Sequence, residues 1–468
     1  MTRMSTVEQT WFACEIIIKG LIMNFRKTTL LLLVCIILLY SIQHNLLAKK
    51  RTSIPTVNKQ QDPRADRTTF SRQTQENMRP SSVSLTGEEN TLSITQTNDL
   101  LTLPKQKSPQ YMQGLYFTAY FMKSSKLDET LQKAKIAGIN TIIFDVKEMQ
   151  GSVYFSIVPH PELTLTTAEP ILDLNQTIEK IHAYGFYCVA RIVQFYNISC
   201  ARKHPELQPK QINGGYWQEK PEQPAWLDPS HPMVQSELLK IIEIVAKSNV
   251  DEIQLDYVRF PTEGKLSEAI FYFQTEDQAR KRDDPEYIPR EKREIIRDYV
   301  KEVKKITNKH HVGLSADIFA IVAWQRTPDI KNTGQDIAYL SPYLDRLHPM
   351  IYSSHFSDDF IFENDHNFIN RPYRIIKSCI TKTRDSATVN CQIIPYLQAF
   401  GWRVDYTKTY MYDQLQAAAN SKSRGYILWN GVNSYQKALS WIEQWNIENQ
   451  NQNLVVVDHQ EEIKKSID

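Results

Sequence analysis

The chain has 468 residues, of which 41% are hydrophobic, so it can bury a large core and still carry further segments. Its 55 basic and 53 acidic residues give a formal net charge of +2, which supplies no general attraction for nucleic acid or for an acidic surface. These values disfavour a nucleic-acid partner and leave the oligomeric state open.

The N-terminal part predicts a membrane anchor. Arg26 and Lys27 precede an apolar run that starts at Thr28, and three basic residues follow it at 49–51. The run over 28–48 is just long enough to cross a bilayer, and no small-residue cleavage site follows it. We therefore expect a single uncleaved signal anchor rather than a removed signal peptide. Residues 1–27 would be a short cytoplasmic segment, with its true start open between Met1 and Met23. The remaining chain would be extracytoplasmic, at the cell envelope or surface.

Residues 49–110 are rich in Thr, Ser, Gln, Asn, Arg and Pro and show no apolar periodicity. Such a segment cannot bury enough apolar surface to offset the entropy lost on ordering, so we expect a flexible linker. Residues 446–468 are expected to form a polar C-terminal tail.

Between residues 111 and 445, short apolar segments alternate with longer amphipathic ones, a pattern typical of repeated βα units. Helices are expected at 127–137, 172–184, 234–248 and 291–307. No glycine-rich phosphate-binding turn follows a predicted strand, which disfavours an open doubly wound sheet that binds nucleotides. The pattern predicts an α/β fold, a (β/α)8 TIM barrel. Its eight strands are placed at 114–121, 141–147, 187–195, 250–258, 312–319, 346–352, 392–398 and 425–430.

Polar and aromatic side chains stand at or just beyond the carboxyl ends of these strands. In a parallel barrel those ends meet at the catalytic mouth, so the side chains are expected to converge there. The set comprises Asp145, Lys147, Arg191, Asp256, Arg259, Asp317, His348, Tyr352, Gln398, Trp429 and Asn430.

Two of these carboxyl groups suit glycosidic cleavage, which requires one group to protonate the leaving oxygen and one to attack or to activate water. Asp256 and Asp317 end neighbouring predicted strands, about 4.8 Å apart, and could approach the separation of about 5 Å found in retaining enzymes. We expect Asp256 to be the nucleophile and Asp317 the general acid/base, with Asp145 as the reserve acid. Arg259 or Arg191 would keep Asp256 ionised, because a nearby cation lowers the pKa of a carboxylate.

The remaining polar residues of the set are expected to bind substrate. His348 and Tyr352 can bond sugar hydroxyls, or simply form a hydrogen-bonded rim. Lys147, Gln398, Trp429 and Asn430 are assigned to the same group. Aromatic residues in the loops suit stacking on sugar rings or serve as loop anchors, and the insertion 262–290 is either a lid or a packing element. These loop aromatics are Tyr196, Tyr216, Trp217, Trp226, Trp324 and Trp402.

Six sequence blocks resemble the glycosyl hydrolase domain family DUF4015. They lie in order at 144–151, 251–261, 334–335, 349–356, 397–400 and 427–430, and the second reads Asp-Glu-Ile-Gln-Leu-Asp-Tyr-Val-Arg-Phe-Pro. The resemblance implies a TIM-barrel, glycosidase-like fold in bacterial proteins that are often exported or membrane-anchored. This chain departs from the family pattern at Ala320, where glycine is usual, and at Ser353, where proline is common. Both departures lie close to predicted site residues.

Cysteine and histidine spacing adds little. Four barrel cysteines, Cys188, Cys200, Cys379 and Cys391, permit disulfides in an exported domain, with the pairing left open. No metal-binding spacing is present, so neither a metal nor a cofactor is expected. The expected function is hydrolysis of a polysaccharide or oligosaccharide. A catalytically inactive carbohydrate-binding barrel and a transglycosylase are the alternatives.

Overall fold

The computed structural model describes residues 104–158, 160–358, 360 and 371–449. All described residues belong to one compact unit. The expected anchor, most of the expected linker and most of the C-terminal tail lie outside the described residues. Among the helices that are described, none combines the length and the apolar character needed to cross a bilayer.

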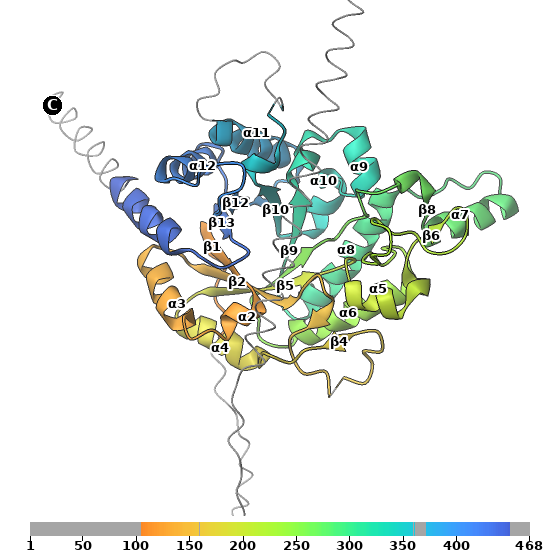
Figure 1. The fold of residues 1–468 in the computed structure, drawn as a ribbon, viewed down its shortest axis with the longest axis horizontal. Coiled ribbons are helices and arrows are strands. Elements are labelled where there is room, and N and C mark those ends of the chain that lie inside the picture. Colours follow the sequence, from red (N-terminus) through yellow and green to blue (C-terminus); the bar gives the residue numbers. More distant parts are fainter. Residues whose placement is uncertain (1–103, 159, 359, 361–370, 450–468) are drawn as a thin grey trace, which may run out of the picture. The chain divides into compact units, whose positions relative to one another are not determined.

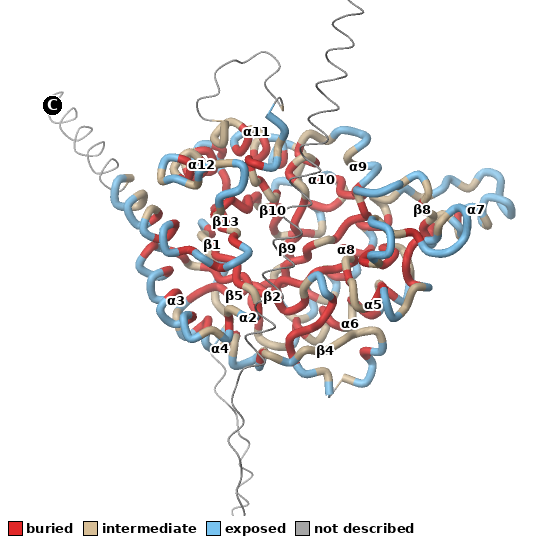
Figure 2. Tube along the Cα trace, in the orientation of Figure 1, coloured by how far each residue is buried: buried red, intermediate tan, exposed pale blue. Residues whose placement is uncertain are grey.

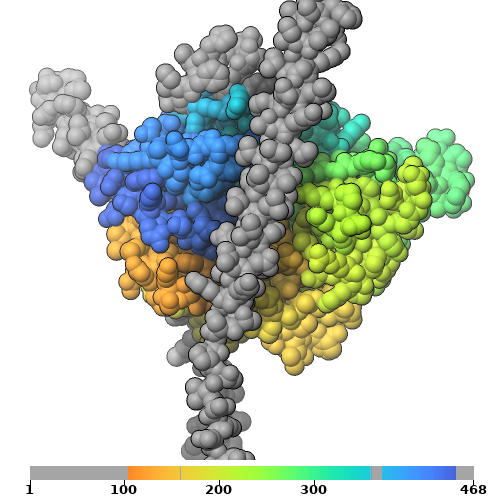
Figure 3. Space-filling view, viewed as in Figure 1, coloured from red at the N-terminus to blue at the C-terminus, as the bar shows by residue number. Residues whose placement is uncertain are grey.

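Eight parallel strands close into a barrel (Figure 1). β1 pairs with β2 on one side and with β13 on the other, which closes the ring. The space-filling view shows the N-terminal barrel segment, in orange, beside the C-terminal one, in blue (Figure 3). This closed ring confirms the TIM barrel expected from the sequence. Its strands are β1 (Met112–Phe117), β2 (Thr141–Lys147), β5 (Tyr187–Val193), β7 (Glu252–Asp256), β9 (Gly313–Phe319), β10 (Arg346–Ile351), β12 (Tyr396–Gln398) and β13 (Gly425–Trp429).

Helices surround the ring and bury one face each. α8 illustrates the cause: Ile296, Val300 and Val303 recur at helical spacing and are fully buried, whereas charged residues occupy the other face. Figure 2 shows the same division for the whole barrel, with buried strands in red inside and exposed helix surfaces in pale blue outside. The long helices are α3 (Leu127–Ile136), α4 (Leu174–Ala183), α6 (Pro232–Ala246), α8 (Lys292–Lys309), α11 (Arg371–Ser386), α12 (Lys408–Asn420) and a last one at 436–449.

Several strands differ from their expected extents: the first ends at Phe117, before the short helix α2 (Ala119–Met122), and the third ends at Val193. The fourth ends at Asp256 because Tyr257 adopts a left-handed conformation, with φ of 52°, and turns the chain out of the sheet. The seventh is interrupted between β11 (Gln392–Ile393) and β12, where Pro395 provides no N–H for the ladder.

The insertion after β7 packs against a neighbouring loop. It contains β8 (Ala269–Ile270), which pairs antiparallel with β6 (Lys210–Gln211), followed by α7 (Tyr272–Asp283). Figure 1 shows α7 projecting from the side of the molecule, away from the strand ring. The segment 262–290 is therefore largely a packing element rather than a lid.

The four cysteines of the barrel form no disulfide. Cys188, Cys200, Cys379 and Cys391 are free thiols, and each is buried. Cys188 packs within β5 and Cys379 within α11, so their side chains belong to the hydrophobic core. The disulfides that the sequence permitted are not present.

The segment before β1 crosses the base of the barrel, at the amino ends of the strands. Lys105 donates from Nζ to the carbonyls of His310 and His311, at 3.0 and 3.3 Å. The backbone N–H of Gln106 donates to Asp251 at 2.7 Å. These contacts fix the start of the domain opposite the end where the candidate site lies.

Candidate active site

Asp256 and Asp317 stand at the same level on neighbouring strands. β7 and β9 pair in parallel with Leu255 opposite Ala316, so the next residue of each strand is an aspartate. Both aspartates are buried, at 5% and 2% exposure, yet both line one cavity of about 710 Å3 at the carboxyl ends of the strands. The structure thus brings the expected pair together.

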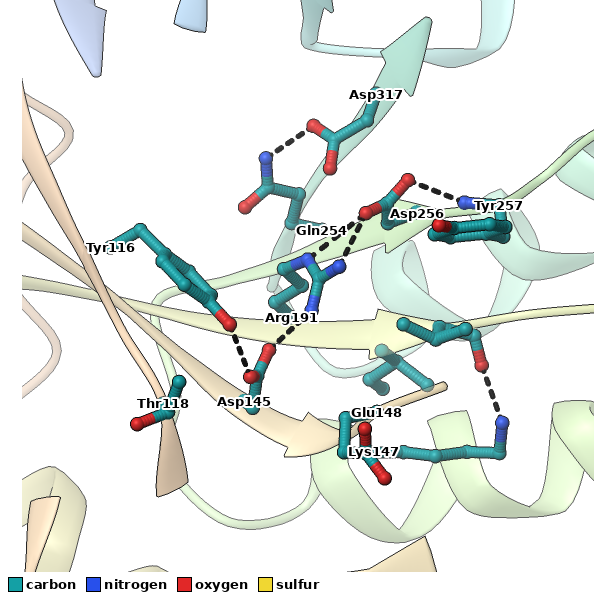
Figure 4. Close-up of polar contacts among 12 residues, drawn as sticks. Tyr116, Thr118, Asp145, Lys147, Glu148, Arg191, Gln254, Asp256, Tyr257 and Asp317 are labelled. Atoms are coloured by element: carbon teal, nitrogen blue, oxygen red, sulfur yellow. Dashed lines mark hydrogen bonds and ion pairs between the residues drawn. The ribbon is translucent and has the colours of Figure 1, made fainter. Parts of the chain in front are cut away.

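A guanidinium and a backbone amide hold Asp256 (Figure 4). Arg191 on β5 donates to its Oδ2 from both Nε, at 3.1 Å, and Nη2, and the N–H of Tyr257 donates to Oδ1 at 2.6 Å. Arg191 is the cation that contacts Asp256, because Arg259 forms no ion pair with it. Of the two arginines expected to keep Asp256 ionised, the structure assigns the contact to Arg191.

Arg191 also reaches Asp145 at the end of β2. Its Nη1 donates to one oxygen of Asp145, and the hydroxyl of Tyr116 donates to the other at 2.5 Å. Burial raises the pKa of Asp145, and the Arg191 charge opposes this effect. Both oxygens are engaged, and Asp145 is not one of the residues that line the cavity. Asp145 therefore lies beside the pair of aspartates and holds the Arg191 guanidinium in position.

Asp317 lies in a different environment. Gln254 donates from its side-chain amide to Oδ1 at 2.5 Å, and the Gln254 carbonyl accepts from the Tyr396 hydroxyl at 3.1 Å. Burial first, and then the negative charge of Asp256, raise the pKa of Asp317 well above its ordinary value. In Figure 4 the second oxygen of Asp317 points to the side of Asp256. Asp317 is thus set up to keep a proton beside a carboxylate.

Sequence reasoning missed three residues that support this pair: Tyr116, Gln254 and Tyr396. The signal for Gln254 was present, because side chains two apart on a strand share a face, and Gln254 precedes Asp256 by two. Tyr116 and Tyr396 gave no comparable signal, since a tyrosine in a strand more often fills the core.

Two expected substrate-binding residues do not line the cavity. His348 bonds the Ile394 carbonyl through Nδ1 at 2.8 Å, and its Nε2 lies 3.8 Å from Glu252, inside the barrel. Lys147 lies beyond a register shift in the pairing of β2 with β5 and donates to the Val193 carbonyl at 2.7 Å; burial lowers its pKa to about 8. The convergence on the mouth expected for these two residues is wrong, because each side chain satisfies a backbone carbonyl inside the protein.

Two further expected residues hold the loops. Gln398 accepts from the hydroxyl of Ser354 at 3.0 Å, and Asn430 donates to the Ala399 carbonyl at 2.6 Å. Both are buried, and neither is among the described residues that line the cavity. Their amides satisfy backbone groups at the strand ends rather than a ligand.

Aromatic side chains form one wall of the cavity. Trp429 packs against Tyr352 with ring centroids 5.5 Å apart, and His355 and Trp402 continue the wall outward at 4.4 Å. Trp217 and Trp226, by contrast, are buried loop anchors. Flat aromatic and amphipathic faces of this kind suit pyranose rings. The cavity is lined by Met149, Arg191, Asp256, Tyr257, Arg259, Glu263, Asp317, Phe319, Ala320, Ile321, Arg326, Met350, Tyr352, His355, Phe356, Ser357, Phe360, Tyr396 and Trp429.

The family model described as "Putative glycosyl hydrolase domain", DUF4015, matches residues 114–435, which include all eight barrel strands apart from the first two residues of β1. The chain belongs to the DUF4015 family. Family membership identifies this DUF4015 barrel as a glycosidase-type domain and implies a carbohydrate as the class of substrate.

Solved structures similar to the DUF4015 chain include glycoside hydrolases. The glycoside hydrolase domain of PgaB (BpsB) from Bordetella bronchiseptica is 11% identical with a TM-score of 0.51, covering 71% of this chain and 98% of that one. A hypothetical protein from Ruminiclostridium thermocellum ATCC 27405 is 25% identical with a TM-score of 0.36, covering 43% and 96%. Among curated proteins, none matches. The PgaB similarity supports the barrel fold.

The two residues expected to depart from the DUF4015 pattern lie at or beside the cavity. Ala320 lines it, at the start of the short 3-10 helix Ala320–Trp324 that follows β9. Ser353 begins another such turn, and its hydroxyl bonds that of Tyr410 at 2.5 Å. The serine thus ties the loop after β10 to α12.

Proposed function

We propose that this DUF4015 protein hydrolyses glycosidic bonds in a polysaccharide or oligosaccharide, with Asp317 as general acid/base and Asp256 as nucleophile. One observation carries the proposal: two carboxyl groups share one cavity in opposite electrostatic environments. Asp256 accepts from a guanidinium, whereas Asp317 contacts a neutral amide and has a raised pKa.

This difference matches the division of labour in glycoside hydrolysis. The acid must hold its proton until the leaving oxygen departs, and the partner must be ionised to attack or to stabilise positive charge on the sugar. Arg191 places a positive charge and two hydrogen bonds on Asp256, whereas burial raises the pKa of Asp317 and so favours its protonated form. Adjacent strands lie about 4.8 Å apart, a spacing that supports a retaining mechanism, in which the two carboxyl groups are close.

The cellular setting belongs to the same proposal. The apolar run at 28–48, with basic residues on both sides, supports a membrane anchor with the barrel on the extracytoplasmic side. A cell-envelope or surface glycan is then the accessible substrate. Fractionation of cells that express the full chain, followed by protease treatment of intact cells, tests this location.

The enzymatic proposal is tested with the full-length protein in detergent. We expect it to release reducing ends from at least one glycan in a broad panel, and we expect Asp256→Asn and Asp317→Asn to lose this activity by at least about 10³-fold. Asp298→Asn, an exposed carboxylate on α8, is the matched control and should act like the wild type. Equal activity of all four proteins would refute the assignment.

Rescue experiments distinguish the roles of the two carboxylates. Asp317→Asn should recover on aryl glycosides whose phenol departs without protonation, whereas Asp256→Gly should recover with azide and form a glycosyl azide. The aromatic wall of Tyr352 and Trp429 also suits a binding module, so glycan binding without bond cleavage would identify a carbohydrate-binding barrel. Longer oligosaccharides among the products would identify a transglycosylase.

A further inference from the structure

Arg259 is a buried cation in the cavity that forms no ion pair with any carboxylate of the described residues. Arg259 is 7% exposed and lines the same cavity as Asp256 and Asp317. No carboxylate of the described residues lies within ion-pair distance of its guanidinium, although Arg191, Arg290 and Arg346 in the same barrel all have one. This contrast sets Arg259 apart from those three arginines.

Aromatic rings and one carbonyl hold the guanidinium in place. Its Cζ lies 4.1 Å from the ring centroid of Phe319, 4.7 Å from that of Trp226 and 5.2 Å from that of Tyr257. Nη1 donates to the Phe260 carbonyl at 2.9 Å and reaches the Thr262 hydroxyl at 3.4 Å. The hydrogens of Nε and Nη2 have no acceptor among the described residues, so one edge of the fork is free.

A charge removed from water is normally paired or hydrogen-bonded, because its desolvation is unfavourable. Cation–π contacts offset part of that penalty here, and they also fix the orientation of the planar group. A rigid, preorganised guanidinium with a free edge is well suited to bind an oxyanion through two parallel hydrogen bonds.

The other charges of the cavity leave this role open. Arg191 is neutralised by Asp145 and Asp256. Arg326 at the rim pairs with Asp329 at 2.7 Å. Glu263 also lines the cavity, but it is exposed and forms no ion pair with Arg259.

Arg259 lies close to the reacting groups along the chain. It follows Asp256 by three residues, and both side chains line the same cavity. A group bound at Arg259 would therefore belong to the sugar at the cleavage point or to the one beside it.

We propose that Arg259 forms a subsite for an anionic substituent, so that the preferred substrate is a glycan whose sugars carry a carboxylate, sulfate or phosphate group. This inference rests on the proposed function, since it specifies the substrate class of the same cavity. Arg259 is the specificity-determining residue and takes no part in bond cleavage.

Matched pairs of glycans test the inference on the unaltered full-length protein. Uronate-containing polysaccharides are compared with their carboxyl-reduced forms, sulfated ones with desulfated forms, and phosphorylated ones with dephosphorylated forms. We expect kcat/KM to be about 10- to 100-fold higher for the charged member of one pair, the value of one charge-assisted contact. The responding pair identifies the anion. Equal kcat/KM within every hydrolysed pair would overturn the inference while leaving the hydrolase assignment intact.

Substitutions assign the preference to Arg259. Arg259→Met keeps the apolar stem and should abolish the preference by raising KM for the charged glycan toward the value for its neutral form. Arg259→Lys keeps the charge without the fork and should restore part of it. Arg202→Met, an exposed arginine on the short helix α5 (Ile198–Lys203), is the control for loss of one positive charge and should keep the full preference. If the preference for the charged glycan survives Arg259→Met, Arg259 is not the residue that binds the anionic group.

A binding measurement separates failure of this inference from failure of the proposed function. Asp317→Asn protein is titrated with uronate, sulfate- and phosphate-bearing oligosaccharides and with their neutral forms. Charge-selective binding that depends on Arg259, together with a wild-type protein that cleaves no glycan, would keep the subsite and refute the hydrolase. Binding that does not distinguish charged from neutral oligosaccharides would refute the subsite.

Discussion

The side-chain amide of Gln254 donates a hydrogen bond to Oδ1 of Asp317. The amide cannot turn over without loss of the bond that Tyr396 donates to its carbonyl. Oδ1 of Asp317 is therefore committed as an acceptor, and a proton on this carboxyl group must sit on Oδ2. Gln254 thus decides which oxygen of Asp317 presents the proton, without touching a substrate itself.

Removal of Gln254 should change the pH profile as well as the rate. The amide stabilises the ionised form of Asp317 and so lowers its pKa, against the larger effect of burial. In Gln254→Met we expect the alkaline limb of kcat/KM to move to higher pH and kcat to fall by about 10- to 100-fold. Tyr396→Phe should shift the limb in the same direction by less. A reduced rate with an unmoved pH profile would indicate a merely structural role.

The raised pKa of Asp317 predicts a dependence of stability on pH. Because the folded protein holds this proton more tightly than the unfolded chain, the contribution is present below the ordinary carboxyl pKa and is lost as pH rises through the raised one. Asp317→Asn has no proton to lose at this position. We therefore expect its unfolding free energy at pH 7 to exceed that of the wild type by about 1.4 kcal/mol for each unit between the folded and unfolded pKa of Asp317. Denaturant unfolding of both proteins from pH 4 to 8 measures it. The two should converge at the acidic end.

Glu252 predicts the opposite behaviour at the base of the barrel. It is fully buried against Arg346, whose charge and the nearby His348 lower its pKa to about 2 despite its burial. Its contribution to stability is present above the ordinary pKa and is lost as pH falls toward 2. Glu252→Gln leaves Arg346 buried without a counter-charge, and we expect a loss of about 3–5 kcal/mol in unfolding free energy at pH 7. Glu302→Gln, an exposed glutamate on α8, should cost almost nothing.

The eight strands of the barrel could be predicted from the sequence because each one is a short apolar segment. Their alternation with amphipathic segments then predicts the order of the strands in a parallel barrel. The pair of Asp256 and Asp317 followed from the same rule, since strand order places their ends side by side. The direction in which each side chain points could not be predicted from strand order. His348 and Lys147 stand near strand ends like the aspartates, yet each satisfies a backbone carbonyl inside the protein.

Arg259 shows the same limit. Its place in the chain, three residues after Asp256, suggested a counter-ion for that carboxylate. The left-handed turn at Tyr257 separates the two, and Arg191 on the neighbouring strand takes the position instead. Such a turn at a non-glycine residue has no reliable mark in a single sequence.

The segment before β1 should contribute measurably to stability. The N–H of Gln106 satisfies the buried carboxylate of Asp251, which His182 and the N–H of Cys188 also contact. Gln106→Pro removes this donor, and we expect a loss of about 1–3 kcal/mol. Lys107→Pro, at an exposed neighbour, is the control. Thermal unfolding that shifts equally in both variants would show that the segment acts through its backbone conformation alone.

The same contacts determine where the described chain enters the barrel. Lys105 and Gln106 lie at the amino ends of the strands, opposite the mouth that Asp256 and Asp317 line. The described part of the N-terminal segment therefore does not cross the cavity. A long glycan can occupy the mouth without displacing this segment.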